Sequence, residues 1–488
     1  MTDTGPFALI VLLVSAIGLA AILSNRLTAW ARVPSPALFL MGAAVAAEVV
    51  PAVHAPQERT VGRVVTVALL LILFDGGMRI GWSRFRTVAV PIGLVGVLGT
   101  LLTVAAGAVL VHLAFGLVWY EALLVATAVA PTDPAVVFSV LGRREVTGRA
   151  GTILEGESGA NDPVGIALMV SLIAAGGLGA GTFVNVGGEF VLQMGVGAAV
   201  GISGGRLLLW FMRRVPLPSE GLYPLRTLAC ALALFGVATL AHGSGFLTVF
   251  VAGIVLGDER APYKQEINGF HSALASLSEI VAFVVLGLTV QVAELGRADV
   301  WVPGIVLGVV LAFVIRPVLV SLCLIPARLK ANERTFVLFG GLKGAVPILL
   351  GTFLVTAKVH DAQRLYGIVV VVVVFSVVVQ GTLVPTVAYR LGLPMRSIEP
   401  EPWALGVRLR DEPDGAHRLT VAKGSVADGR TIGGLTQLPG AAWISLVVRD
   451  GQLVPVRGDT ELRAGDVVVV VLDDPHMSEK LTAVFEPP

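Results

Sequence analysis

The chain has 488 residues, of which 55% are hydrophobic and 14% are charged, and its formal net charge is +1. A soluble protein of this length would carry roughly 25% charged residues, so the composition excludes an ordinary soluble domain and predicts a multi-pass membrane protein. The small net charge gives no indication of a nucleic-acid partner. The two cysteines, Cys230 and Cys323, lie in apolar segments and predict neither a disulfide framework nor a metal site.

Because roughly 20 apolar residues cross a bilayer, the hydrophobic runs predict about thirteen transmembrane helices. We expect them at residues 6–24, 34–52, 61–78, 88–115, 119–141, 152–175, 186–212, 224–241, 244–258, 270–292, 301–325, 334–357 and 364–389. The run 6–24 lacks the basic segment and the cleavage site of a signal peptide, so we expect a retained first helix. Residues 1–395 are therefore predicted to be an all-α polytopic membrane domain.

Two of these helices contain residues that interrupt helical hydrogen bonding. The fifth contains Pro131-Thr132-Asp133-Pro134, and the twelfth contains the glycine-rich run 340–347 with Lys343 at its centre. With the seventh helix as a linker, helices 1–6 and 8–13 would form two inverted six-helix repeats with broken crossing helices. Interrupted segments at matching places in two halves are typical of the substrate site of a transporter.

The distribution of lysine and arginine predicts the orientation. Most loop basic residues fall on one side of the membrane, among them Arg84, Arg86, Arg143, Arg213 and Arg328. By the positive-inside rule this side is cytoplasmic, which places the N-terminus outside and the C-terminus inside. We expect the lipid bilayer in question to be the bacterial cytoplasmic membrane.

The composition changes after Pro394. Residues 400–488 are charged and contain no further apolar span. Strands are expected at 417–422, 443–449, 453–457 and 466–472, with Asp450-Gly451 as a hairpin turn and helices at 430–438 and 476–485. This pattern predicts a small α+β cytoplasmic domain.

The helix 152–175 carries Glu157-Ser158-Gly159-Ala160-Asn161-Asp162-Pro163, and ionisable groups at membrane depth mark ion or proton pathways. We expect Asp162 to hold a proton and a cation alternately, because desolvation favours the neutral form of a carboxyl group. A structural carboxylate paired with a base is the alternative. Thr132 and Ser158 offer oxygen atoms to the same monovalent cation.

Other polar residues have competing assignments. Asp133 either binds the ion or caps the half-helix that follows it. Asn161 is expected to orient Asp162 or to bond the broken helix. Glu157 needs a counter-charge, and Arg316 is the one arginine deep in an otherwise apolar predicted segment, so an ion bridge between them is expected.

Two further charges lie near helix interruptions or ends. Lys343 either compensates the half-helix dipoles and the carboxylates or extends its amino group to the interface. Asp75 is expected at the cytoplasmic end of the third helix, as a cap or as a guard of the entrance.

At these motifs the chain resembles the monovalent cation:proton antiporter-1 family, which includes NhaP-type antiporters. The resemblance covers residues 6–390 and rests on Thr132-Asp133-Pro134, on the Glu157–Pro163 motif and on Gly341-Leu342-Lys343-Gly344-Ala345-Val346-Pro347, where the family usually has arginine at position 343. It implies Asp162 as the essential carboxylate, Thr132, Asp133 and Ser158 around the ion, and the Glu157–Arg316 bridge. It also implies electroneutral exchange, a homodimer and a role in pH and cation homeostasis.

The C-terminal segment resembles an RCK-C (TrkA-C) domain through Leu419-Thr420-Val421, the run 429–435 and Ala464-Gly465-Asp466. Antiporters joined to this domain are often NhaP2-like potassium/proton exchangers. Related domains pair and bind nucleotides or cyclic dinucleotides, so the resemblance implies such a regulator. A dimerisation role without a ligand is the alternative, since residues 400–488 contain no glycine-rich phosphate-binding fingerprint.

The sequence thus predicts a secondary antiporter that exchanges K⁺ for H⁺ without a cofactor for transport. A Na⁺(Li⁺)/H⁺ antiporter is the first alternative, because the carboxylates do not distinguish these cations. A ligand-gated cation channel is a second, although the chain has no Thr-Val-Gly-Tyr-Gly filter. We do not expect an enzyme, because the spans contain no His-Glu-x-x-His or Ser/His pattern.

Overall fold

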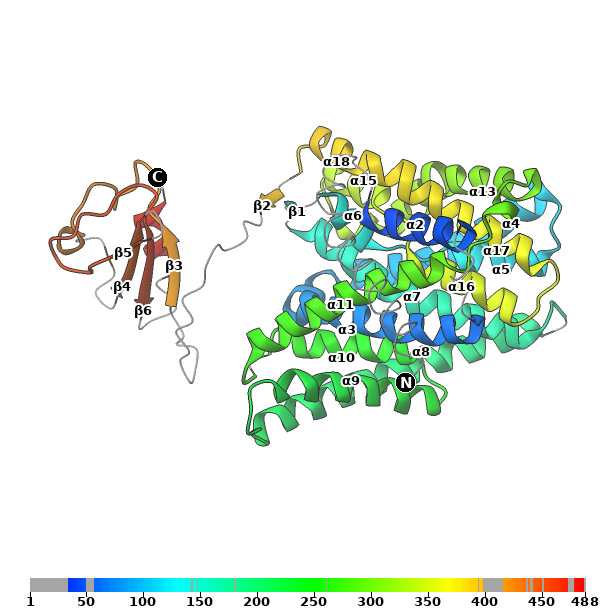
Figure 1. The fold of residues 1–488 in the computed structure, drawn as a ribbon, viewed down its shortest axis with the longest axis horizontal. Helices are drawn as coiled ribbons and strands as arrows, with labels where there is room; N and C mark the ends of the chain where they lie inside the picture. The colour runs from blue at the N-terminus through cyan, green and yellow to red at the C-terminus, as the bar shows by residue number, and fades with distance from the viewer. Residues whose placement is uncertain are drawn as a thin grey trace, which may run out of the picture. The chain divides into compact units, whose positions relative to one another are not determined.

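The structure is a computed structural model of the chain. It describes residues 34–49, 57–141, 144–146, 148–179, 181–259, 261–393, 395–397, 416–435, 438, 442–449, 452–472 and 478–486. The chain divides into two compact units, Met1–Pro400 and Glu401–Pro488. The first is helical and the second is built on a small sheet (Figure 1).

The helices of the first unit follow one another with short connections. They are α2 (Ser35–Val49), α3 (Glu58–Gly93), α4 (Thr100–Phe115), α5 (Trp119–Val129), α6 (Pro134–Leu141), α7 (Arg149–Ala175), α8 (Thr182–Arg214), α9 (Leu222–Leu240), α10 (Gly245–Gly257), α11 (Lys264–Gly287), α12 (Val292–Leu295), α13 (Ala298–Val310), α14 (Arg316–Cys323), α15 (Ala331–Phe339), α16 (Ala345–Thr356), α17 (Ala362–Phe375) and α18 (Gly381–Arg390). Three π-helical segments join or extend them: η1 (Leu94–Gly99), η2 (Leu311–Ile315) and η4 (Ser376–Gln380).

Each predicted transmembrane helix from the second onward overlaps a helix of the structure. Eight continuous helical stretches in the described part are long and apolar enough to span a membrane, and three further apolar helices are shorter. The predicted first helix, 6–24, lies outside the described residues, so the number thirteen stays a prediction. The short helix α12 was not predicted.

The third and fourth predicted helices are joined by helical residues, which the prediction missed. The stretch Arg59–Phe115 is continuous except for non-helical backbone at Gly81 and Val88. Gly81 has φ +64°, and a Cβ there would collide with the Asp258 carboxylate, so glycine permits both the bend and the close contact. The residues between the two kinks mix exposed Trp82 with arginines, a composition suited to the membrane interface.

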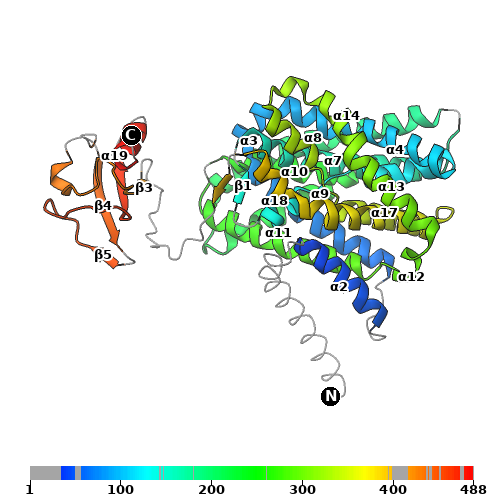
Figure 2. The same ribbon diagram turned by 90° about the horizontal axis from the view of Figure 1, so that it is seen from above.

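The helices that carry the candidate ion-site motifs lie inside the bundle. α10 and α11 pack on α3 on one side, with α8 and α9 against α10, whereas α4, α13 and α17 lie on the other side, with α13 packed on both α4 and α17 (Figures 1 and 2). α5, α7 and α16 lie between these groups and contact one another. Burial follows this arrangement, since every residue of α16 from Ala345 to Thr352 is buried.

Both predicted interruptions are present. Residues 130–133 separate α5 from α6, and residues 340–344 separate α15 from α16. Pro131 and Pro134 lack the N–H groups that a continuous helix would need, and Gly340, Gly341 and Gly344 disfavour the helix at the second break. Each interruption frees backbone groups that cannot be left unpaired at membrane depth.

A two-stranded antiparallel sheet joins two loops of the first unit. β1 (Arg144–Val146) connects α6 to α7, and β2 (Met395–Ser397) follows α18, with Val146 opposite Met395. The sequence analysis did not predict these strands, because three-residue strands have no detectable alternation. β2 thereby ties the chain leading to the second unit to the loop before α7.

The second unit has a four-stranded antiparallel sheet of order β3-β6-β4-β5, formed by β3 (Ala416–Thr420), β4 (Ala442–Arg449), β5 (Gln452–Val454) and β6 (Val467–Leu472). The four predicted strands and the terminal helix α19 (Ser478–Phe485) are present. The predicted helix 430–438 is wrong: among its described residues, 430–435 and 438, Ile432–Gly434 form a 3₁₀ turn, η5, and the others are not helical. Thr431 bridges to Glu461, and the Gly433 N–H donates to the Gly458 carbonyl.

A buried ion pair stabilises this sheet. The Asp466 carboxylate accepts bonds from Arg449 Nε and Nη2, both at 2.8 Å, and from the Arg463 N–H at 2.8 Å. Burial raises the pKa of Asp466, but the Arg449 guanidinium and these hydrogen bonds outweigh it and hold the pKa below its usual value. The stabilisation is therefore fully present above about pH 4 and is lost as the pH falls through the folded pKa.

Asp466→Asn should therefore lower the local free energy of opening of the sheet by about 1–3 kcal/mol at pH 7, because it leaves Arg449 without its counter-charge. Hydrogen exchange of the β4 and β6 amides in the full-length protein measures this loss. The difference between wild type and variant should shrink below about pH 4. Exposed Asp459→Asn is the control, and equal exchange in both variants at pH 7 would contradict the role of the pair.

Candidate functional site

The two helix breaks cross each other and satisfy each other's free backbone groups. The Asp133 N–H of the first break donates to the Leu342 carbonyl of the second at 2.7 Å. In return, Lys343 Nζ donates to the Ala130 carbonyl, at the C-terminal end of α5, at 2.8 Å. This reciprocal pair replaces helical hydrogen bonds that neither break makes for itself.

Asp133 has a capping role in the structure. Its Oδ1 accepts the Ala135 N–H at 2.9 Å, and the N–H groups of Val136 and Ala345 also face the carboxylate. A carboxylate there offsets the positive ends of both half-helices, α6 and α16. The close approach requires Gly344, where a Cβ would collide with the Asp133 carboxylate.

Glu157 and Arg316 form a buried bidentate ion pair. Arg316 Nη1 lies 2.6 Å from Glu157 Oε1, and Nη2 lies 2.9 Å from Oε2. Arg316 also donates to the carbonyls of Leu338 and Val337, at the end of α15. The pair therefore links α7 to α14 and to the helix that precedes the second break, as expected from the sequence.

Asn161 bonds the first break. Its Nδ2 donates to Thr132 Oγ1 at 2.7 Å, and its Oδ1 accepts the Thr132 N–H at 3.4 Å. Thr132 Oγ1 in turn points to Glu157 Oε1 at 3.5 Å. Of the two roles expected for Asn161, the structure shows contact with the broken helix.

Asp162 differs from its neighbours because part of its carboxylate is unsatisfied. The residue is only 7% exposed, and its Oδ1 has no hydrogen-bond partner among the described residues. Ser158, one turn earlier, is within hydrogen-bonding reach of the carboxylate. An unpaired buried carboxylate oxygen is costly, so this atom is the point at which a proton or a cation would be stabilised.

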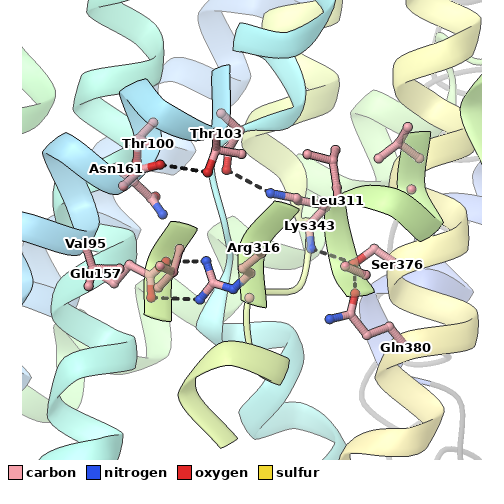
Figure 3. A pocket seen from close by; sticks show the side chains of 17 residues that line it. Val95, Thr100, Thr103, Glu157, Asn161, Leu311, Arg316, Lys343, Ser376 and Gln380 are labelled. Atoms are coloured by element: carbon pink, nitrogen blue, oxygen red, sulfur yellow. Dashed lines mark hydrogen bonds and ion pairs between the residues drawn. The ribbon is translucent and has the colours of Figure 1, made fainter. Parts of the chain in front are cut away.

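A narrow cavity adjoins these residues (Figure 3). It is small, with room for about one or two water molecules. Its polar lining includes Glu157, Asn161, Arg316 and Lys343 from the sequence-predicted set. The cavity lining does not include the predicted ion-site residues Asp162, Asp133, Thr132 and Ser158. The cavity therefore lies beside the Asp162 carboxylate and not around it.

Sequence analysis missed several residues of this cavity. Ser376 Oγ accepts the Lys343 N–H at 2.9 Å and donates to Gln380, whose Nε2 bonds the Phe339 carbonyl at the end of α15. A signal was present, since serine and glutamine four residues apart interrupt a run of valines. Residues of η1, η2 and η4 all line the cavity, and such π-helical turns are frequent at functional sites.

Two acidic residues lie outside the cavity. Asp75 does not cap its helix, because α3 continues past it; the carboxylate pairs with Arg79 at 2.7 Å and is 4% exposed. Glu279 in α11 was not singled out from the sequence, although it is an acidic residue in an apolar span. The charged groups acting on it are Asp133 and Arg79.

Comparison with known proteins fits this geometry. Residues 8–389 match the model of the transmembrane sodium/hydrogen exchanger family, and residues 416–481 match the TrkA-C domain. The chain belongs to the sodium/hydrogen exchanger family. The C-terminal unit is therefore a TrkA-C domain, as the sequence predicted.

Curated proteins similar to this chain include three named antiporters. The chain is 33% identical over 425 residues to the K⁺/H⁺ antiporter NhaP of Alkalimonas amylolytica, covering 86% of this chain and 73% of that protein. It is 32% identical over 434 residues to the K⁺/H⁺ antiporter NhaP2 of Shewanella oneidensis, with the same coverages. The Na⁺/H⁺ antiporter NhaH of Halobacillus dabanensis is 30% identical over 290 residues, 55% of this chain and 68% of that protein.

The fold is also known. The sodium proton antiporter MjNhaP1 from Methanocaldococcus jannaschii superposes with a TM-score of 0.65 at 20% identity, covering 78% of this chain and 99% of that chain. This likeness confirms the fold class predicted for the exchanger domain.

The Glu157–Arg316 pair should be important for folding. Arg316→Met should lower the free energy of unfolding by about 3–5 kcal/mol, because it leaves Glu157 buried without a counter-charge. Thermal unfolding of the purified protein in detergent measures the loss. Glu157→Gln/Arg316→Met should recover part of it. Exposed Arg214→Met is the control, and equal melting of both single variants would contradict a structural role for the pair.

Proposed function

We propose that the protein is a secondary antiporter that exchanges a monovalent cation, K⁺ in preference to Na⁺, for H⁺ across the bacterial cytoplasmic membrane. The observation that carries this proposal is the buried Asp162 carboxylate, which has an unpartnered oxygen beside two crossing broken helices. The neighbouring carboxylates Asp133 and Glu157 do have partners: Asp133 caps half-helices, and Glu157 pairs with Arg316.

Competition at Asp162 would produce the coupling. With a proton bound, the carboxyl group is neutral and tolerates its desolvated position. When the proton leaves, the carboxylate and the nearby oxygens of Thr132 and Ser158 provide the hard ligands that an alkali cation requires. Because one carboxylate cannot hold both, exchange takes place when the loaded site alternates between the two sides of the membrane.

The preference for K⁺ is supported by the relatives. Those that match over 86% of this chain, and therefore beyond the exchanger domain, are named K⁺/H⁺ antiporters. The relative named Na⁺/H⁺ antiporter matches over 55%. A Na⁺(Li⁺)/H⁺ antiporter keeps the same site and is the alternative tested below.

We infer further that the protein functions as a homodimer with its C-terminus in the cytoplasm. The exposed faces of α8 and α9 carry large apolar residues, including Phe183, Val191, Trp210 and Leu240, as expected for surfaces that face lipid or a second copy. The TrkA-C domain would then regulate exchange, with a nucleotide or cyclic dinucleotide as the class of ligand implied by its resemblance.

The β1–β2 sheet is the route that we assign to this regulation. β2 lies at the end of the exchanger domain and pairs with β1, which leads directly into α7, the helix of Glu157 and Asp162. Val146 is 3% exposed, and a Cβ on Gly151 of α7 would collide with the Val146 carbonyl. A displacement of β2 would therefore be transmitted to the start of α7 through packed backbone.

Asp162→Asn should abolish exchange, because an amide neither releases a proton nor compensates a cation. Proteoliposomes with a trapped pH dye and an imposed ΔpH measure this when K⁺, Na⁺ and Li⁺ are added in turn at two clamped voltages. The wild type should respond to K⁺ independently of voltage, and the variant should match protein-free vesicles.

Exposed Asp361→Asn is the matched control for this experiment. Proton movement retained in Asp162→Asn would refute the assignment of Asp162. If the wild type responds to Na⁺ and not to K⁺, the protein is a Na⁺/H⁺ antiporter. Cation flux without proton movement would indicate a channel.

Disrupting β2 should reproduce the loss of the TrkA-C domain. In an antiparallel pair, every second residue of a strand donates its backbone N–H to the partner strand. Proline has no N–H, so the double substitution Met395→Pro/Arg396→Pro removes at least one hydrogen bond between β2 and β1. We expect this variant and a chain ending at Pro400 to show the same altered pH profile of exchange. If the truncated chain has an altered pH profile but the proline variant has the wild-type profile, the β1–β2 sheet is not the route of regulation. If the truncated chain itself has the wild-type profile, the TrkA-C domain does not regulate exchange.

A further inference from the structure

Four basic side chains at one end of the bundle have no role in the antiport cycle described above. Arg84 and Arg86 belong to the kinked joint of α3, residues 81–88. Arg328 and Lys330 follow a 3₁₀ turn, η3 (Ile325–Ala327), and precede α15. All four are exposed, and none has a carboxylate partner among the described residues. We call these four residues the basic patch.

Helix lengths place both segments of the basic patch at the ends of membrane crossings. The stretch Arg59–Phe115 has 57 residues, which is enough for two crossings, and the kink at Gly81 lies between them. From Arg59 to Gly81 the helix is about 34 Å long, close to the thickness of the hydrocarbon core. The apolar stretch Ala298–Cys323 is a further crossing, and η3 follows its end. The basic patch therefore lies where the chain leaves the hydrocarbon region.

Packing brings the two segments to the same membrane face. η3 contacts α3, and α14 contacts η1. Val320 of α14 lies beside the end of η1, since a Cβ on Gly99 would be 3.8 Å from its side chain. The chain after Val320 leads to η3, whereas the chain before Gly99 leads back to the joint of α3, so these segments run antiparallel. The two pairs of basic residues thus belong to segments that pack together.

The charges of the basic patch differ from that of the arginine just before the joint. Arg79 pairs with Asp75 at 2.7 Å, so its charge is compensated. Arg84 donates from Nε to the Ile80 carbonyl at 3.1 Å, which is a neutral acceptor. This bond orients the guanidinium at the joint and leaves its positive charge without a counter-ion.

The carboxylates near the patch are already engaged. Asp258, at the end of α10, accepts the Ser83 N–H, and the Lys264 ammonium is a nearby positive charge that acts on it. Glu333 of α15 accepts the Lys330 N–H at 3.1 Å and so caps the start of its own helix. The patch therefore keeps an excess of positive charge at this face.

Large apolar side chains border the patch. Trp82 is 53% exposed, and its ring lies 5.9 Å from that of Phe85. Beside the other segment, Leu322 and Ile325 are 58% and 59% exposed. Tryptophan is enriched at the headgroup level of membranes, and exposed apolar residues at the end of a crossing face acyl chains. This combination fits a phospholipid, whose phosphate meets the basic groups and whose acyl chains meet the apolar border.

We propose that the basic patch binds the headgroup of an anionic phospholipid in the membrane leaflet at this face. Arginine and lysine form charge-assisted hydrogen bonds with phosphate oxygens, and basic pockets between transmembrane helices suit anionic headgroups. The lipid bridges the joint of α3 and the chain after η3. This inference goes beyond the proposed antiport function, and its test does not require exchange.

Fluorescence quenching by brominated lipids tests the proposal on the full-length protein in phosphatidylcholine vesicles. Bromine on an acyl chain quenches a nearby indole, and the difference between the wild type and Trp82→Phe isolates the signal of Trp82. Brominated phosphatidylglycerol and brominated phosphatidylcholine are compared at equal mole fraction. We expect phosphatidylglycerol to bind beside Trp82 about tenfold more tightly than phosphatidylcholine.

Charge variants, each measured with and without Trp82→Phe, locate the site. Arg84→Gln/Arg86→Gln should lower the preference for phosphatidylglycerol to about threefold or less, because it removes two positive charges. Arg84→Lys/Arg86→Lys keeps both charges and should retain most of the preference. Arg328→Gln/Lys330→Gln should lower the preference as well, although it leaves the joint unchanged.

Arg59→Gln/Arg63→Gln is the matched control. Both residues are exposed, and they lie at the opposite end of the same helix, α3. The control removes the same number of charges from the protein as each patch variant. It should therefore keep the wild-type preference for phosphatidylglycerol at Trp82.

Several results would overturn the proposal. Equal quenching of Trp82 by the two brominated lipids would show that no anionic headgroup is selected there. An equal loss of preference in the control would show that the total charge of the protein decides, and an equal loss in Arg84→Lys/Arg86→Lys would show a structural role for these arginines. Loss of the preference on adding inorganic phosphate at constant ionic strength would make a free phosphate ion the ligand. If Arg84→Gln/Arg86→Gln does not fold, an unchanged preference in Arg328→Gln/Lys330→Gln refutes the site.

Discussion

The structure depends on one constraint: polar backbone groups and charges placed at membrane depth need partners within the protein. Breaking two helices in the interior creates free N–H and C=O groups, which lipid cannot satisfy. Where the two breaks cross, they satisfy each other: the Asp133 N–H donates to the Leu342 carbonyl, and Lys343 Nζ donates to the Ala130 carbonyl. Either break alone would leave its half-helix ends unpaired, so the two halves of the domain stabilise each other at this point.

The same constraint distinguishes Asp162 from the other polar groups at the crossing. Glu157 and Arg316 use each other and the end of α15, and Asn161 uses Thr132. The partners of these groups are other buried groups of the protein. Asp162 retains an oxygen without such a partner. In the proposed cycle, an ion or a proton would be bound and released at this oxygen without breaking the contacts that hold the crossing together.

The second unit has its own core and its own buried pair, Arg449–Asp466, around the four-stranded sheet. The chain leading to it is tied to the start of α7 by backbone: β1 pairs with β2, and α7 begins three residues after β1. In the proposed regulation, the second unit would act through this connection without contributing a side chain to the ion site.

The sequence alone determined the membrane class, the positions of most helices, both interruptions and the presence of charged and polar residues inside the bundle, because local composition carries this information. Apolar runs of bilayer length, prolines and glycines within them, and rare intramembrane charges act at short range along the chain. The helical joint around Gly81 and the 3₁₀ turn at 432–434 were missed, because a contact with Asp258 and pairing with Glu461 and Gly458 decide them.

Only the tertiary structure decided which polar groups meet. The pairing of Lys343 with Ala130, the bond from the Lys343 N–H to Ser376 and the bond of Asn161 to Thr132 join residues far apart in the sequence. Their partners are chosen by the crossing of the helices, which sequence spacing does not report. The sequence thus indicates that charges are buried inside the bundle, and the structure shows that Glu157 is paired with Arg316 whereas one oxygen of Asp162 has no partner among the described residues.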